Sequence, residues 1–377
     1  MKIQIDGTNT LNKGAELMLY AILEEIEKKH PNATILFNTS LGRSNEIHSN
    51  LKIKQSPLLR YGQYGKVILS KLKIQSSLFT DYHYRHKPDL VLDASGYRFG
   101  DQWKQMSDHI TYIEKYYDKL KRKGAKIVFL PQAFGPFNTP CAKESVKILN
   151  KYADLIIARE TSSKDNLIKA GGDKSRIFQY PDFTCLTNGI ANPKYESIKG
   201  KICIIPNKKM ITHTDASSED YLSMLSKVIL FIRKKGKDVF LLNHEGEGDL
   251  QLCKQINIKF DNTLPIISNL NAKEIKGVIG QSYFVISSRY HGVASALNQS
   301  VPCLATSWSH KYEMLFNDFN LKEHIIDIKD QSQLVYNKIS SLLSPSSNEQ
   351  MRNHLNEANI TVKINTQKMW ELVWEQL

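Results

Sequence analysis

The sequence has few cysteines and no long apolar run. Its five cysteines are odd in number, lie far apart and form no C-x-x-C pair, which argues against a disulfide framework or a zinc ribbon. No segment approaches the roughly 18 apolar residues needed to cross a bilayer. The first residues, MKIQIDGTN, lack the apolar core of a signal peptide. We therefore expect a cytoplasmic protein whose cysteines are mostly core residues.

Acidic residues are scarce relative to basic ones. Lys and Arg number 51 against 38 Asp and Glu, which gives a formal net charge of +13. Such a charge attracts nucleic acid, anionic lipid or phosphorylated substrates. Because no zinc finger, RGG tract or RNP-like motif accompanies the charge, we expect no nucleic-acid partner. Charge alone leaves open the hypothesis of a non-catalytic polyanion-binding protein.

Residues 51–87 form a strongly basic segment. This segment has eight basic residues against a single acid, Asp81, and carries many aliphatic and aromatic side chains between them. That composition is typical of a helix lying on an anionic membrane surface. The alternative is a pair of surface helices whose apolar face packs on the domain.

Short apolar runs alternate with helical patterns along most of the remaining chain. This alternation predicts an α/β fold with mostly parallel sheets. A polar, turn-rich stretch over 187–200 predicts a domain boundary. The predicted strands are 2–5, 34–37, 90–92, 126–130, 155–158, 201–205, 239–242, 283–286 and 301–305.

The stretch from Phe284 to Lys311 carries the strongest functional signal. A buried strand ends in two serines, Arg289 and His291 follow, and a helix is predicted to begin near His291. Ligands of open α/β sheets bind at the carboxyl ends of strands, and a helix N-terminus favours anions. Arg adds a planar fork for carboxylate or phosphate, and His titrates near neutral pH. A purely structural Arg and His are the alternative.

Several short motifs follow one another along the chain. They are Asn12-Lys13-Gly14-Ala15-Glu16, Asp93-Ala94-Ser95-Gly96, Gln132-Ala133-Phe134-Gly135-Pro136, Ala158-Arg159-Glu160, Ser288-Arg289-Tyr290-His291-Gly292, Val301-Pro302 and Lys311. In this order, which covers most of the chain, the motifs resemble those of the polysaccharide pyruvyl transferase family. One departure is Asp93-Ala94-Ser95-Gly96, where family members often have a Gly-Gly-Gly-like strand end.

The resemblance implies a GT-B-like fold, in which two Rossmann-like domains with parallel sheets face a central cleft. We accordingly expect an N-terminal domain over residues 1–190 on the acceptor side, which includes the basic segment 51–87. A C-terminal domain over residues 191–345 would bind the donor. Helices over residues 346–377 are expected to pack back on the N-terminal domain.

The family also implies an activity. It transfers the enolpyruvyl group of phosphoenolpyruvate to two hydroxyls of a hexose and releases phosphate. We expect a galactose-type hexose on a polyprenyl-diphosphate-linked precursor of a bacterial surface polysaccharide, such as a capsule or exopolysaccharide. The enzyme would then be peripheral at the inner membrane face, with residues 51–87 on the anionic surface. We expect no cofactor besides the donor.

The chemistry suggests roles for individual residues. Phosphoenolpyruvate carries a carboxylate and a phosphate, and Arg289 and Arg159 are the natural pair to bind them. His291 is the first candidate for the acid that protonates the methylene carbon, although it could instead hold the phosphate. Asp93 and His244 are the candidate general bases. Further expected substrate-binding residues are Tyr290, Gly292, Asn12, Glu16, Ser288 and Lys311.

The sequence also bears on two other kinds of ligand, a metal ion and a nucleotide-sugar donor. His83 and His86 have H-x-x-H spacing, but no cysteine or acid completes a metal set, so we expect no metal site. A GT-B glycosyltransferase that uses a nucleotide sugar is the alternative enzyme. Such an enzyme needs an acid on the ribose, and Glu313 follows the Arg289–His291 loop at a suitable place.

Overall fold

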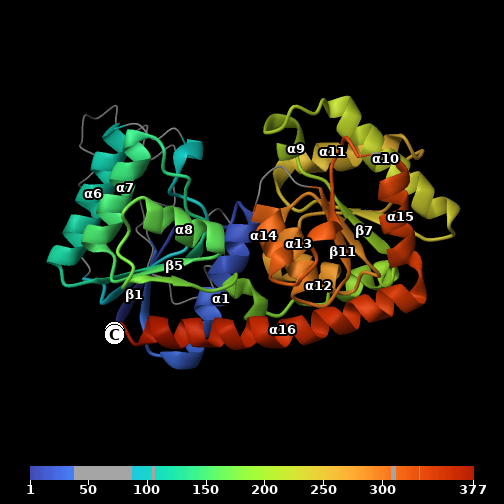
Figure 1. Cartoon of the computed structure of the whole chain (residues 1–377). Helices are drawn as coiled ribbons and strands as arrows, with labels where there is room; N and C mark the ends of the chain where they lie inside the picture. Colours follow the sequence, from blue (N-terminus) through green and yellow to red (C-terminus); the bar gives the residue numbers. More distant parts are fainter. Residues whose placement is uncertain (38–86, 104–106, 307–310, 331) are drawn as a thin grey trace, which may run out of the picture. The chain divides into compact units, whose positions relative to one another are not determined.

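The computed structural model describes residues 1–37, 87–103, 107–306, 311–330 and 332–377. They form two compact units, each built on a six-stranded parallel sheet with helices against it (Figure 1). The first unit comprises residues 1–11, 18–183 and 367–377, and the second comprises 12–17 and 184–366. The predicted α/β class with parallel sheets is confirmed. The basic segment 51–87 lies outside the described residues, except for Lys87.

The sheet of the first unit positions two acids side by side. Its order is β2 (Thr34–Phe37), β1 (Lys2–Asp6), β3 (Leu90–Asp93), β4 (Lys126–Gln132), β5 (Leu155–Ala158) and β6 (Ile177–Gln179). All neighbouring strands are parallel, and Asp6 pairs with Asp93 where β1 and β3 end. All of β3 is buried, as expected for a central strand in a parallel sheet. One face packs against α6 (Ser107–Arg122), α7 (Pro140–Tyr152) and α8 (Thr161–Lys169).

The sheet of the second unit is covered on both faces. Its order is β12 (Ile325–Ile326), β11 (Cys303–Thr306), β10 (Val285–Ser287), β7 (Ile202–Ile205), β8 (Val239–Leu242) and β9 (Ile266–Ile267). Successive side chains of a strand point to opposite faces. Cys203 and Ile205 therefore pack toward α12 (Ala272–Gly280), α13 (Tyr290–Leu297) and α14 (Lys311–Asn317). Ile202 and Ile204 pack toward α10 (Ser218–Lys234), α11 (Gly246–Ile258) and α15 (Ser332–Leu343).

Two helices contribute residues to both units. The first turn of α1 (Lys13–Lys29) belongs to the second unit and the rest to the first. Helix α16 (Pro345–Trp374) is 30 residues long and is divided at Gln367. In the second unit, Arg352 donates hydrogen bonds to the carbonyls of Ser282 and Tyr283. In the first unit, the Trp370 ring packs edge-on against Phe183.

The remaining elements are short. They are α9 (Lys209–Thr212) and the 3-10 turns η2 (Asp101–Trp103), η3 (Phe183–Leu186), η4 (Pro193–Ile198) and η5 (Lys322–His324). No helix in the described parts of the chain has an apolar stretch long enough to cross a membrane.

Candidate functional site

The carboxyl edge of the second sheet gathers polar side chains from three neighbouring strands. Asn207 follows β7, His244 and Glu245 follow β8, and Ser288 and Arg289 follow β10. Because β10, β7 and β8 are adjacent and parallel, these strand ends lie at one edge of the sheet. This is the edge at which open α/β sheets bind ligands.

Three helix N-termini also meet at this edge. Asn12 precedes α1 and accepts a hydrogen bond from the Ala15 amide, Glu245 is the N-cap of α11, and Arg289 is the N-cap of α13. Glu245 is hydrogen-bonded to both of the other residues. The Asn12 amide donates to both Glu245 oxygens at 3.1 and 3.2 Å, and Arg289 Nη1 lies 2.5 Å from Glu245 Oε2. Helix N-termini carry partial positive charge, so their meeting point favours an anion.

Arg289 is held by two carboxylates. Its Nε and Nη2 both lie 2.7 Å from Asp249 Oδ2, while Nη1 contacts Glu245. The Asp249 side chain is 1% exposed, and its other oxygen accepts from the Lys208 amide. Burial lowers the pKa of Arg289, but the hydrogen bond and charge of Asp249, together with the charge of Glu245, outweigh that effect and raise it. Asp249 thus fixes the guanidinium, which keeps one N–H on each Nη beyond these bonds.

His291 lies against the first turn of α1. A Cβ placed on Gly14 would lie 2.1 Å from His291 Nδ1, so only glycine allows the helix to approach the imidazole this closely. The ring also packs edge-on against Tyr290, 5.2 Å between centroids. The contact brings together two motifs that lie almost 280 residues apart in the sequence.

More cations surround this edge. Burial lowers the pKa of His244 well below 6.5, and the charges of Arg289, His291 and Lys13 add to that effect, so His244 is neutral at physiological pH. Burial, and then Arg289, likewise lower the pKa of Lys209. His244 Nδ1 is buried and has no hydrogen-bond partner among the residues that the structure describes. The site therefore combines positive charge with a neutral imidazole.

Glu16 has a structural position. It is 1% exposed, pairs with Lys13 at 2.5 Å and accepts a backbone hydrogen bond from Ala272, the first residue of α12. Burial raises its pKa despite these partners. Glu16 thus attaches the first turn of α1 to the second unit, which places Asn12 and Gly14 beside Glu245 and His291.

Ser288, Tyr290 and Gly292 support the loop around Arg289. The Ser288 hydroxyl is buried between Tyr221 at 2.6 Å and Thr306 at 2.5 Å. A Cβ on Gly292 would lie 2.5 Å from Ser287 Oγ. Lys311 Nζ lies 5.2 Å from the centre of the Tyr290 ring, a cation–π distance. Of these predicted substrate-binding residues, the geometry gives Ser288 and Gly292 a positioning role.

Asp93 and Arg159 belong to the first unit. Asp93 is fully buried: Oδ1 accepts from the Ser95 amide, and Oδ2 accepts from Tyr117 and lies 3.4 Å from Arg98. These contacts occupy the carboxylate that the sequence suggested as a base. Arg159 is 5% exposed and contacts Glu160 at 3.3 Å and Asp182 at 3.7 Å.

Asp6, which pairs with Asp93 in the sheet, should make the stability of the protein depend on pH. Burial and then Asp93 raise the pKa of Asp6 to about 6, although Tyr116, Gln4 and Arg98 favour its ionised form. A raised pKa means that the folded state binds the proton more tightly, so this contribution to stability is present below about pH 4 and is lost as the pH rises through 6. The shift from 3.8 to about 6 corresponds to about 3 kcal/mol.

Asp6→Asn should remove this dependence. We expect its unfolding free energy, relative to the wild type, to rise by about 2–3 kcal/mol between pH 4 and pH 7.5 in urea titrations. Asp118→Asn, on the exposed surface of α6, is the control and should show no such change. A relative stability of Asp6→Asn that is constant with pH would contradict the prediction.

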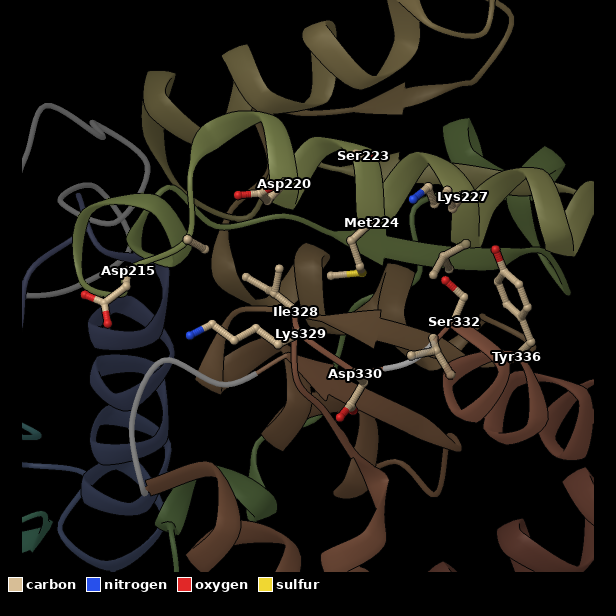
Figure 2. Close-up of a pocket in the computed structure, with 13 residues that line it drawn as sticks. Asp215, Asp220, Ser223, Met224, Lys227, Ile328, Lys329, Asp330, Ser332 and Tyr336 are labelled. Carbon is tan, nitrogen blue, oxygen red and sulfur yellow. The ribbon is translucent and has the colours of Figure 1, made fainter.

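A separate groove of about 410 Å³ lies in the second unit. Lys227 and Asp220 of α10 and Tyr336 of α15 line it together with residues 328–330 (Figure 2). It shares no lining residue with the Arg289 cluster, and Asp220 is engaged in the N-terminal capping box of α10. In the described residues, no group of three or more His, Cys, Asp or Glu could hold a metal ion.

Sequence reasoning missed part of this site. Glu245, Asp249 and Lys209 were not predicted as functional residues, although Glu245 follows a predicted strand. The signal for these residues was their place after β7 and β8, because β7 is the neighbour of β10 in the sheet and β8 is the next strand beyond β7. Glu313, the residue considered for a nucleotide ribose, is exposed in the first turn of α14.

Comparison with solved structures shows the fold. A putative UDP-N-acetylglucosamine 2-epimerase from Listeria monocytogenes superposes with a TM-score of 0.61 at 15% identity, covering 98% of this chain and 94% of the other. The UDP-GlcNAc 2-epimerase from Neisseria meningitidis gives 0.60 at 12% identity. Anabaena Alr3699/HepE in complex with UDP and glucose gives 0.59 at 12% identity, and both of these matches cover 100% of each chain. The GT-B-like fold is therefore confirmed, and identities this low show nothing about the ligand.

Comparison at the sequence level shows the family. No curated protein gave a significant match. The sequence model of polysaccharide pyruvyl transferase matches residues 12–310, which include Asn12, Glu245, Arg289 and His291. The chain therefore belongs to the polysaccharide pyruvyl transferase family.

Proposed function

We propose that the protein is a ketal-pyruvyl transferase that moves the enolpyruvyl group of phosphoenolpyruvate onto two hydroxyls of a hexose and releases phosphate. The observation that carries the proposal is the meeting of three helix N-termini at Asn12, Glu245 and Arg289 in a member of this family. Lys13, Lys209 and His291 add cationic or titratable groups around it.

The donor's two anions suit this arrangement. Phosphoenolpyruvate needs at least two anchors, and the N–H groups of α1, α11 and α13 supply them together with the remaining N–H groups of Arg289. His291 lies beside Arg289 in sequence and against Gly14 in space, a position from which it transfers a proton or holds the phosphate. The neutral, buried His244 is able to accept a proton.

The acceptor and the location are also part of the proposal. We propose a galactose-type hexose in a polyprenyl-diphosphate-linked precursor of a bacterial surface polysaccharide. The basic segment 51–87, eight cations against one acid, supports peripheral binding to the anionic inner membrane face. Sedimentation with liposomes tests this, because binding that does not depend on anionic lipid would contradict it.

Two measurements test the reaction. Phosphoenolpyruvate should raise the melting temperature, and phosphate release from it should depend on a galactoside acceptor in wild type and be absent in His291→Ala. UDP is the control ligand, since the nucleotide-sugar alternative predicts stabilisation by UDP. Stabilisation by UDP and not by phosphoenolpyruvate would overturn the proposal.

Gly14→Ala provides a test of the site's geometry. The added Cβ would overlap His291, so the imidazole must move by about 1 Å or more, and we expect phosphate release to fall on the order of 100-fold. Alanine favours a helix by up to about 1 kcal/mol over glycine, so stability should not fall in parallel. Urea unfolding beside steady-state kinetics separates the two effects. Equal losses of stability and activity would indicate a folding defect instead.

A further inference from the structure

Glu245 is a partly exposed carboxylate surrounded by the positively charged groups of the site. Its side chain is 24% exposed, whereas that of Asp249, the other partner of Arg289, is 1% exposed. Its oxygens accept hydrogen bonds from Arg289 Nη1 and from the Asn12 amide. Its negative charge also offsets part of the lowering of the Lys209 pKa. The carboxylate thus lies where three helix N-termini meet, the position best suited to a bound anion.

Donor binding at this point brings negative charges together. Arg289 is already flanked by Asp249 and Glu245, and the donor adds a carboxylate and a phosphate. At about 4 Å, two like charges repel by several kcal/mol near a protein surface. A carboxylate next to further negative charge favours its protonated form, so taking up one proton relieves the repulsion. The Asp249 side chain is 1% exposed and that of Glu245 is 24% exposed, so Glu245 is the one of the two acids that faces solvent.

We propose that Glu245 takes up a proton when phosphoenolpyruvate binds and then donates it to the methylene carbon of the donor. This inference rests on the proposed function. It changes the role expected for His291, which lies among cations and instead receives a hydroxyl proton. Glu245 would then be a catalytic residue that the sequence did not reveal.

The reaction balances with these groups. The O–H bond of Glu245 breaks as the π electrons of the donor form a C3–H bond, leaving C2 as an oxocarbenium-like electrophile. The first sugar hydroxyl forms a C–O bond to C2 and gives its proton to His291. The C2–O bond to phosphate then breaks, the phosphate leaves with the electron pair, and it receives the proton from His291. The second hydroxyl closes the ketal and returns a proton to Glu245.

Other acids of the second unit fit this role less well. Glu16 is 1% exposed and is engaged by Lys13 and by the start of α12. His244 is kept neutral by burial and by neighbouring cations, so it carries no proton to donate as an imidazolium. Glu245 alone among these combines exposure with direct bonds to Arg289 and Asn12.

Proton uptake on donor binding tests the inference. Calorimetric titration of phosphoenolpyruvate at pH 8, in buffers of different ionisation enthalpy, should show net proton uptake by the wild type, because the phosphate itself is already fully ionised there. Glu245→Gln should take up none, bind the donor at least as tightly, and release phosphate at least about 100-fold more slowly. Glu247→Gln is the matched control: it lies in the same helical turn, 69% exposed, and should behave as the wild type.

The outcomes separate the two proposals. No binding of phosphoenolpyruvate to the wild type would refute the proposed function. Binding with the same proton uptake in wild type and Glu245→Gln would leave the proposed function intact and overturn the role of Glu245. Glu245→Ala, which also removes the bonds to Asn12, should abolish uptake in the same way. Turnover retained in either folded variant would likewise overturn the inference.

Discussion

Arg289→Lys is expected to lower kcat/KM for phosphoenolpyruvate about 100-fold, although the positive charge remains. Arginine uses Nε and Nη2 on Asp249 and Nη1 on Glu245, and a lysine ammonium cannot reproduce that planar set of contacts. Losing two charge-assisted hydrogen bonds costs about 3 kcal/mol, which corresponds to that factor. Steady-state phosphate release measures it.

Arg122→Lys is the matched control for this prediction. Arg122 is 79% exposed and pairs with Asp118 on the surface of α6, where such a pair contributes little. Its kinetics should equal those of the wild type. If Arg289→Lys also kept wild-type kinetics, the positive charge alone would account for the role of Arg289. The planar guanidinium with its several N–H donors would then not be needed for activity.

The sequence predicts much of this fold for a physical reason. Strands such as β3, β5 and β7 are buried along their whole length, so each forms a short apolar run between polar turns. The two-residue strands β9 and β12 are too short to produce such a pattern. The first turn of helix α11 contains Gly246 and Gly248, and glycine has a low helix propensity. The sequence pattern therefore does not predict this helix.

The site is predictable only in part. Arg289 and His291 follow a strand directly and begin a helix, so local pattern suffices to find them. The contact of Gly14 with His291 depends on how the first turn of α1 packs, through Glu16, on the second unit. Asp249 lies in a helix, and only the adjacency of β10, β7 and β8 brings it to Arg289. Strand order is a tertiary property that local pattern does not contain.

Asp249→Ala is expected to lower both stability and activity. The substitution leaves the largely buried Arg289 with a single carboxylate, Glu245, and removes the acceptor of the Lys208 amide. Breaking a buried ion pair costs about 3 kcal/mol or more, which urea unfolding will measure. Glu247→Ala, an exposed acid two residues away on the same helix, should change the unfolding free energy by less than about 0.5 kcal/mol.

The double variant Asp249→Leu with Arg289→Met separates stability from function. Replacing both members of a buried ion pair by apolar residues of similar volume is often neutral, so we expect most of the lost stability to return. Phosphate release should stay absent, because the guanidinium that the donor needs is gone. Recovery of activity together with stability would show that the pair only supports the fold. Recovery of stability alone would show that the pair is needed for activity beyond its support of the fold.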